Sequence, residues 1–289
     1  MRRTLAIFVN DLGLLLDARG FGAAALACYR AAHACDPRWT APAFNLGLEY
    51  KRRRDWTRSL EWNRRACAVA ERGAACFWNL GIAATALGDW TTARYAWRGY
   101  GVPLDDGDGP IAMQLGTTPI RIVPDASAEV VWTERIDPAR AIIRSVPLPD
   151  SGRRYGDLVL HDGEPRGKRM LGEHEVSVFD EIALLESSRI PTYQAEISGV
   201  GAEAIATLEK EIGEAGFGAE NWSQSIHLLC AACSEGRPHA HGEHHPRSAP
   251  PRDAWTVGIG APAADVERIL AAWRDAHPDA RVEVQCVLE

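Results

Sequence analysis

The hydrophobic positions of the first hundred residues follow a helical period. Apolar residues recur at spacings of three and four through Leu5–Ala18, Phe21–Cys35 and Trp90–Tyr100, and each stretch is predicted to be an amphipathic helix. The pair Leu-Gly also returns at one fixed interval, as Leu12-Gly13, Leu46-Gly47 and Leu80-Gly81. This period of 34 residues is typical of helix-turn-helix repeats that bury their apolar faces by stacking.

The repeats occupy residues 6–39, 40–73 and 74–107, and two further columns agree between them. These columns are a small position at Ala25, Ser59 and Ala93, and a large position at Tyr29, Asn63 and Trp97. The pattern resembles the tetratricopeptide repeat (TPR) family, whose small residues let paired helices approach while large residues fill the gap. The resemblance implies an α-solenoid of three TPR-like repeats over residues 1–107.

The same resemblance implies a ligand-binding surface. In this family the first helix of each repeat lines a concave surface, which here would carry Asn45, Leu48, Lys51, Arg52, Trp78, Asn79 and Ile82. Asn45 and Asn79 stand where family members often hold the backbone of a ligand. The alternative is that both asparagines only bond neighbouring helix ends. The implied partner is another protein or a peptide.

Charge is distributed unevenly along the chain. Residues 1–107 contain 15 Lys+Arg and 10 Asp+Glu, whereas the remainder contains 17 and 29, and the whole chain has a net charge of −7. A basic surface attracts acidic ligands, so an acidic peptide or protein is the expected partner of the repeats. The sequence has no basic stripe interleaved with aromatic residues, which argues against nucleic acid.

The apolar segments and the cysteines of the sequence indicate the cellular compartment of the protein. No stretch of the sequence approaches the roughly 20 apolar residues that a membrane helix needs. The seven cysteines show no disulfide spacing pattern. We therefore expect a soluble bacterial protein of the cytoplasm, which does not bind membranes; the sequence leaves its oligomeric state open.

A β-rich middle domain is predicted over residues 108–190. The strands Glu129–Ile136 and Ala141–Val146 flank the turn Asp137-Pro138-Ala139-Arg140, which makes a hairpin. Two more short strands, Asp157–His161 and Glu175–Phe179, favour a small barrel or sandwich. Four nearby residues could perform acid–base chemistry, but each lies in or beside a predicted turn, where polar residues are common: His161, Asp162, Glu173 and His174.

The last hundred residues, 191–289, repeat the order strand-helix-strand. The predicted strands are Thr192–Ile197, Trp222–Leu229, Trp255–Ile259 and Arg281–Leu288, and the predicted helices are Ala202–Ala215 and Asp265–Ala276. This order is that of the split, ferredoxin-like α+β sandwich. Alternation along the last strand predicts that Cys286 points toward the helices as a core residue. The fold class is therefore multidomain α and α+β.

Cysteine and histidine concentrate in an insertion at residues 230–250 of this last domain. Cys230 and Cys233 are followed by His239 and His241, and His244 or His245 could substitute for either histidine. Two thiolates and two imidazoles form a tetrahedral zinc site, and four protein ligands make that site structural rather than catalytic. A catalytic or transport site with three ligands, and a redox Cys-x-x-Cys pair, remain as alternatives.

The predicted function is that of a protein–protein interaction adaptor or regulatory scaffold with a structural zinc. One form of it is an immunity-type protein that neutralises a toxin, since an acidic face could block a basic active site. No catalytic residue is assigned from the sequence. The alternative is a zinc-dependent hydrolase that uses the TPR repeats to dock its substrate.

Overall fold

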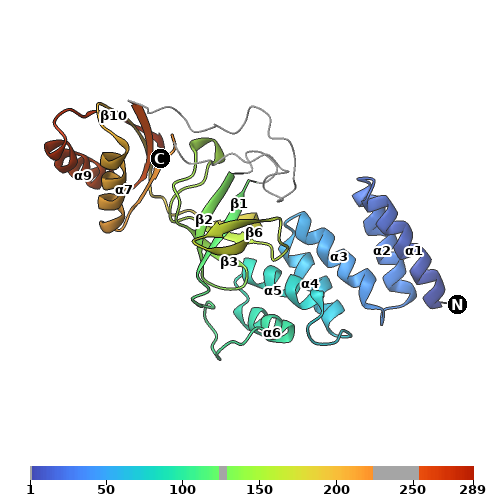
Figure 1. Cartoon of the computed structure of the whole chain (residues 1–289). Helices are drawn as coiled ribbons and strands as arrows, with labels where there is room; N and C mark the ends of the chain where they lie inside the picture. The colour runs from blue at the N-terminus through green and yellow to red at the C-terminus, as the bar shows by residue number, and fades with distance from the viewer. Residues whose placement is uncertain (1, 124–128, 224–253) are drawn as a thin grey trace. The chain divides into compact units, whose positions relative to one another are not determined.

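The computed structural model describes residues 2–123, 129–223 and 254–289 (Figure 1). The chain divides into two compact units, Met1–Ala112 and Met113–Glu289. The first unit is helical, and the second contains both the β-rich and the α+β regions predicted from the sequence. The protein therefore has the expected multidomain class of a helical N-terminal region followed by β-containing regions.

Six helices build the first unit. They are α1 (Arg2–Asp17), α2 (Gly22–Cys35), α3 (Thr40–Arg52), α4 (Trp56–Cys67), α5 (Ala75–Ala86) and α6 (Trp90–Tyr100). Each helix packs against the next along the chain, and α3 also contacts α5 (Figure 1). Asp55 and Asp89 cap α4 and α6 at equivalent places, because their side chains accept the backbone N–H groups of Arg58 and Thr92.

One contact is repeated in every helix pair. The glycine of each Leu-Gly pair lies against the large residue sixteen positions later, so the contacts are Gly13 with Tyr29, Gly47 with Asn63 and Gly81 with Trp97. A Cβ atom at these glycines would lie 2.6, 2.4 and 2.6 Å from that side chain, which is too close for any residue but glycine. The predicted columns of small and large residues are all buried at these helix crossings.

The second pair fills its crossing with polar residues. Ser59 Oγ donates a hydrogen bond to the carbonyl of Gly47 at 2.9 Å, and Asn63 Nδ2 donates to the carbonyl of Ser59 at 2.9 Å. Both side chains are fully buried, so these bonds offset the cost of placing the hydroxyl and the amide N–H group away from water, whereas Asn63 Oδ1 has no partner among the described residues.

A five-stranded β-barrel begins the second unit. Its strands are β1 (Thr117–Ile122), β2 (Glu129–Arg135), β3 (Arg140–Ile143), β4 (Leu158–His161) and β6 (His174–Glu186), while β5 (Gly167–Leu171) pairs only with β6. Neighbouring strands are antiparallel, and a parallel pairing of β1 with β6 closes the barrel. Of the two architectures predicted for this region, the barrel is the one observed.

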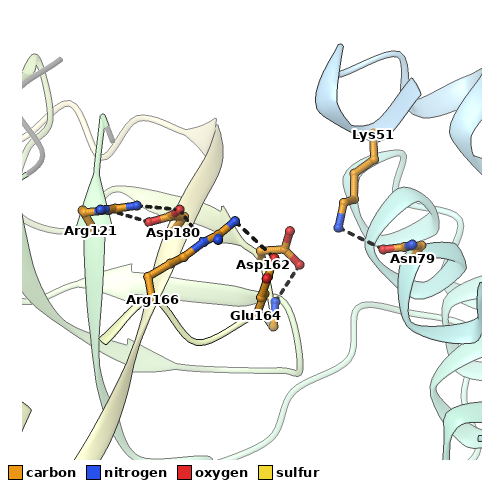
Figure 2. Close-up of polar contacts among 8 residues, drawn as sticks. Lys51, Asn79, Arg121, Asp162, Glu164, Arg166 and Asp180 are labelled. Carbon is orange, nitrogen blue, oxygen red and sulfur yellow. Dashed lines mark hydrogen bonds and ion pairs between the residues drawn. The ribbon is translucent and has the colours of Figure 1, made fainter. Parts of the chain in front are cut away.

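An ion pair spans the closing strands. Arg121 of β1 faces Asp180 of β6, and its Nε and Nη2 atoms lie 2.6 and 2.9 Å from the two carboxylate oxygens (Figure 2). Arg166 also pairs with Asp180, at 3.1 Å. The bidentate contact fixes the register of β1 against β6.

The described remainder of the second unit, residues 191–223 and 254–289, is a four-stranded antiparallel sheet with two helices. The elements are β7 (Thr192–Ser198), α7 (Ala202–Glu214), β8 (Gly218–Asn221), β9 (Ala254–Gly260), α9 (Ala263–Ala276) and β10 (Arg281–Leu288). The strand order is β10-β7-β9-β8. Leu208 of α7 and Trp273 of α9 share one core with strand residues that include Ile197 and Val257, so both helices cover the same face of the sheet.

Three details of this unit differ from the sequence-based predictions. Strands β1 and β5 were not expected. The second described strand of the α+β part is β8, Gly218–Asn221, which begins soon after the turn at Gly216, where φ is +86°. Trp222 and Ser223 of the predicted strand Trp222–Leu229 lie in a turn, and residues 224–229 lie outside the described residues. Cys286 is exposed, not in the core, because β10 is an edge strand and only Val282 of its apolar residues is buried.

The barrel and the α+β part contact each other within the second unit. Trp222 Nε1 donates to the carbonyl of Val146 at 2.9 Å, and the Val146 N–H donates to Glu220 Oε2 at 3.1 Å. The Tyr155 ring packs against Gly218 and Gly260, where a Cβ atom would clash. These contacts join the two β regions that the sequence analysis divided at residue 190.

Candidate functional site

The residues predicted to bind a partner lie on α3 and α5 and are largely engaged with other helices. Asn45 Nδ2 donates to Asn10 Oδ1 of α1 at 2.9 Å. Lys51 Nζ donates to Asn79 Oδ1 of α5, also at 2.9 Å (Figure 2). These bonds link α1 to α3 and α3 to α5 within the helical unit.

The other members of this predicted surface differ in exposure. Ile82 is fully buried, Leu48 is half-buried, and Trp78 packs edge-on against Trp97 and Tyr100 with centroid distances of 5.0 and 4.9 Å. Arg52 is the exposed residue among the seven, and it pairs with Asp17 at 2.7 Å. Burial tends to lower the pKa of Arg52, but Asp17 and Glu49 outweigh it and raise that pKa.

A second group of polar residues gathers around a pocket of about 600 Å³ at α6. The pocket forms because α6 ends at Gly101, a left-handed residue with φ of +114°, and the following chain returns along the helix. Arg98 Nη2 donates to the carbonyl of Leu104 at 2.8 Å, and Arg94 Nη1 donates to the carbonyl of Gly109 at 2.6 Å. The two arginines thus hold segment 104–109 against the helix.

The lining of this pocket is cationic and aromatic. Three guanidinium groups, those of Arg72, Arg94 and Arg98, share it with the rings of Phe77 and Tyr95. Arg72 is held by a bond from Nη2 to the carbonyl of Arg98 at 2.9 Å. We call these three residues the arginine cluster.

Two carboxylates also line the pocket. Asp106 pairs with Arg98 at 2.7 Å, but the Asp106 side chain is 96% exposed, so water and salt screen this pair. Asp108 is the other. Within the described part of the chain, the buried Nε atom of Arg94 has no hydrogen-bond partner. The pocket can therefore accept a carboxylate or another anion that competes with Asp106 and supplies an acceptor to Arg94.

The sequence analysis did not identify the arginine cluster. Arg94 and Arg98 stand four residues apart on α6, so their shared helix face was a usable signal. The return of segment 104–109 onto that face could not be predicted from the sequence, because it depends on the conformation of Gly101 and on hydrogen bonds to backbone carbonyls.

The predicted zinc ligands lie outside the described residues. These are Cys230, Cys233, His239 and His241, with His244 and His245 as substitutes. Among residues 2–123, 129–223 and 254–289, no three metal-ligating side chains come together as a site. The zinc site stays a prediction from the sequence.

In the barrel, His161 is placed so that it remains neutral. It is fully buried at the end of β4, its Nδ1 atom lies 2.7 Å from the carbonyl oxygen of Asp162, and its ring stacks on Phe179 at 5.5 Å. Burial, and after it the positive charge of Arg135, together lower the pKa of His161 from 6.5 to about 4, although the bond to Asp162 acts in the opposite direction. A buried neutral imidazole stacked on a ring has a packing role.

The other residues considered for acid–base chemistry occupy turns. Asp162 Oδ1 accepts the backbone N–H of Gly163 at 2.8 Å, which stabilises the turn after β4 (Figure 2). Glu173 and His174 are exposed where β5 connects to β6. Each of these positions agrees with the turn assignment made from the sequence.

Comparison with known proteins adds little to this picture. No protein-family model matches the chain, and no curated protein matches it. Among solved structures, one match is a crystal structure of a hypothetical protein from Neisseria gonorrhoeae, with 12% identity over 61% of this chain and 97% of the other. The TM-score is 0.24, which is too low to carry any argument about fold or function. None of the described helices is long and apolar enough to cross a bilayer.

Proposed function

We propose that this protein is an adaptor or regulatory scaffold whose helical unit holds an acidic segment of a partner protein. The convergence of Arg72, Arg94 and Arg98 on one pocket is the observation that carries the proposal. Guanidinium groups bind carboxylates through paired, directional hydrogen bonds. The excess of basic residues in 1–107 adds attraction at longer range.

The seven residues of α3 and α5 that the TPR resemblance assigns to a ligand surface are the second part of the proposed binding surface. Arg52 is the member that a ligand meets first, because its side chain is 53% exposed. Asn45, Lys51 and Asn79 hydrogen bond within the helical unit, so a ligand using them exchanges those bonds for its own. An acidic chain offers carbonyl and carboxylate acceptors for such an exchange.

We further propose family relationships for two regions. The glycine contact repeated at 34-residue intervals supports a TPR-type solenoid for residues 6–107. The strand order β10-β7-β9-β8 with two helices on one face supports a ferredoxin-like assignment for residues 191–289. In TPR proteins a scaffold of this kind is a protein-binding module, which agrees with the adaptor role.

A structural zinc is proposed for the Cys230–His245 segment, on the chemistry of its ligands alone. It would fasten the insertion between β8 and β9. The immunity-type form of the proposal rests on the acidic balance outside the repeats, 17 Lys+Arg against 29 Asp+Glu. The alternative of a zinc-dependent hydrolase needs an open coordination position on the same ion.

The arginine cluster gives the decisive binding experiment. A short fluorescein-labelled glutamate-rich peptide is titrated with the full chain and followed by fluorescence anisotropy. We expect the wild type to bind, and the double variant Arg72→Gln/Arg94→Gln to bind about 10-fold or more weakly, since hydrogen bonds to charged groups contribute about 1.5–3 kcal/mol.

The matched control is Arg58→Gln/Arg65→Gln, which removes the same charge from α4, where Arg58 pairs with the N-cap Asp55 and Arg65 pairs with Glu61. This control should bind as the wild type does. Equal weakening by both double variants would show that net charge, not the pocket, attracts the peptide. Absence of binding by the wild type would contradict the acidic-ligand proposal.

A further inference from the structure

Helix α1 carries an apolar face in the open. Leu5, Phe8, Leu12 and Leu15 recur at spacings of three, four and three, and they are 53, 69, 41 and 49% exposed. The opposite face of α1, which packs inward, bears the small or polar residues Ala6, Asn10 and Gly13. An ordinary amphipathic helix has the reverse arrangement. We call these four large residues the leucine stripe.

The neighbouring helix α2 exposes a stripe of small residues. Ala24, Ala27, Ala31 and Ala34 are exposed and recur at the same spacings of three, four and three. The inward face of α2 bears the larger Leu26 and Tyr29. We call the four alanines the alanine stripe. Helices α1 and α2 pack together at one end of the described helical array (Figure 1).

The outward face of α1 is mainly apolar, although Asp11 on the same helix is also exposed. Four large apolar side chains on one helix form a contiguous patch of the kind that marks an interaction surface. Neither stripe contains a charged residue, so contact between the stripes themselves is apolar. The surface is chemically distinct from the arginine cluster.

We propose that a second copy of this chain covers the end, with the leucine stripe of one protomer packed into the alanine stripe of its partner. In a two-fold interface, the same two contacts occur twice: one stripe of each protomer packs against the other stripe of its partner. The surface of a single protomer must therefore contain both members of a complementary pair. Large and small residues at matched helical spacing are such a pair, because side-chain ridges of one helix fill the grooves of another. The result is a four-helix contact at the dimer axis.

Sedimentation velocity of the full chain tests this proposal. We expect the wild type to sediment with the mass of two chains. Phe8→Glu on α1 and Ala27→Lys on α2 each bury a charge in both halves of the interface, so each variant alone should be a monomer. Leu87→Glu, on a 45% exposed leucine at the end of α5, is the control and should stay dimeric.

Mixing the two monomeric variants gives the sharper result. A mixed dimer contains one unaltered half, and one half in which the new glutamate faces the stripe with the new lysine, so dimers should reappear on mixing. A monomeric wild type overturns the proposal. So does a dimer that survives both substitutions, or a mixture that stays monomeric. None of these variants touches the arginine cluster, so the peptide-binding result is read separately.

Discussion

At the scale of single residues, the barrel interior changes the chemistry of His161. An imidazole in water takes up a proton near pH 6.5, but here burial and Arg135 hold the pKa near 4. Between pH 4 and pH 6.5, the imidazole of His161 is therefore neutral in the folded protein and protonated in the unfolded chain. By linkage, the stability that His161 contributes is present above pH 6.5 and is lost as the pH falls toward 4.

The size of this effect follows from the two pKa values. Lowering the pH from about 7 to about 5 is expected to reduce the free energy of unfolding by about 2 kcal/mol through His161 alone. Urea denaturation at several pH values measures the slope, and His161→Gln should flatten it because glutamine does not titrate. His174→Gln, at an exposed site, is the control. Equal slopes for His161→Gln and wild type would refute the assignment.

At the scale of secondary-structure elements, the helix pairs depend on glycines at their crossings. A Cβ atom at Gly81 would lie 2.6 Å from Trp97, whose indole is fully buried and has no room to move aside. Gly81→Ala is therefore expected to lower the free energy of unfolding by about 1–3 kcal/mol, despite the better helix propensity of alanine.

Gly213 in α7 provides the matched comparison, since a Cβ atom there would meet nothing within 4 Å. Gly213→Ala should leave stability unchanged or raise it by up to about 1 kcal/mol. Chemical denaturation followed by far-ultraviolet circular dichroism gives both values. A Gly81→Ala variant as stable as Gly213→Ala would mean that the crossing tolerates a wider separation.

The elements with a strong period were predictable from the sequence. Helix α6 and strand β10 have the bounds that the pattern predicted, and the β2–β3 hairpin forms around Asp137, whose carboxylate accepts the N–H groups of Ala139 and Arg140. Short β1 and β5 were not predicted, because Pro119 interrupts the first and the second begins with glycine and two charged residues, which are weak strand signals. Cys286 is exposed because β10 lies at the edge of its sheet, and the position of a strand in a sheet cannot be predicted from the residues of that strand alone.

The candidate site was predicted less well for a related reason. The resemblance to TPR repeats assigned seven residues of α3 and α5 to a ligand surface, but it did not predict that Lys51 and Asn79 would bond each other. The arginine cluster arises from a loop that folds back on α6, and no local pattern encodes that return. Local patterns thus predicted helices and their contacts, whereas tertiary contacts made the pocket.

At the scale of the whole molecule, the proposed zinc ties part of the chain to the stability of the second unit. Elemental analysis of the purified protein should find one zinc per chain, and Cys230→Ser should lose the metal and unfold the second unit at lower temperature, because metal binding and folding are coupled. Cys286→Ser removes a thiol that is exposed on β10, and it should keep both metal and stability. A metal-free wild type would refute the zinc site.

The same variant separates the two proposed functions. If Cys230→Ser loses zinc, folds as stably as the wild type and loses a hydrolytic activity that the wild type has, the ion is catalytic and the hydrolase alternative replaces the scaffold. Loss of folding without any such activity supports a structural ion.

The parallel pairing of β1 with β6 sets the order in which the protein can take shape during synthesis. Every helix in the first unit packs on its immediate neighbour, so that unit can fold as soon as its residues leave the ribosome. The barrel must wait, because Ile120 meets Phe179 only after the intervening sixty or so residues have been made. For that interval the edges of β1 and β4 lack their partner β6, and unpaired edges of this kind can pair with other chains.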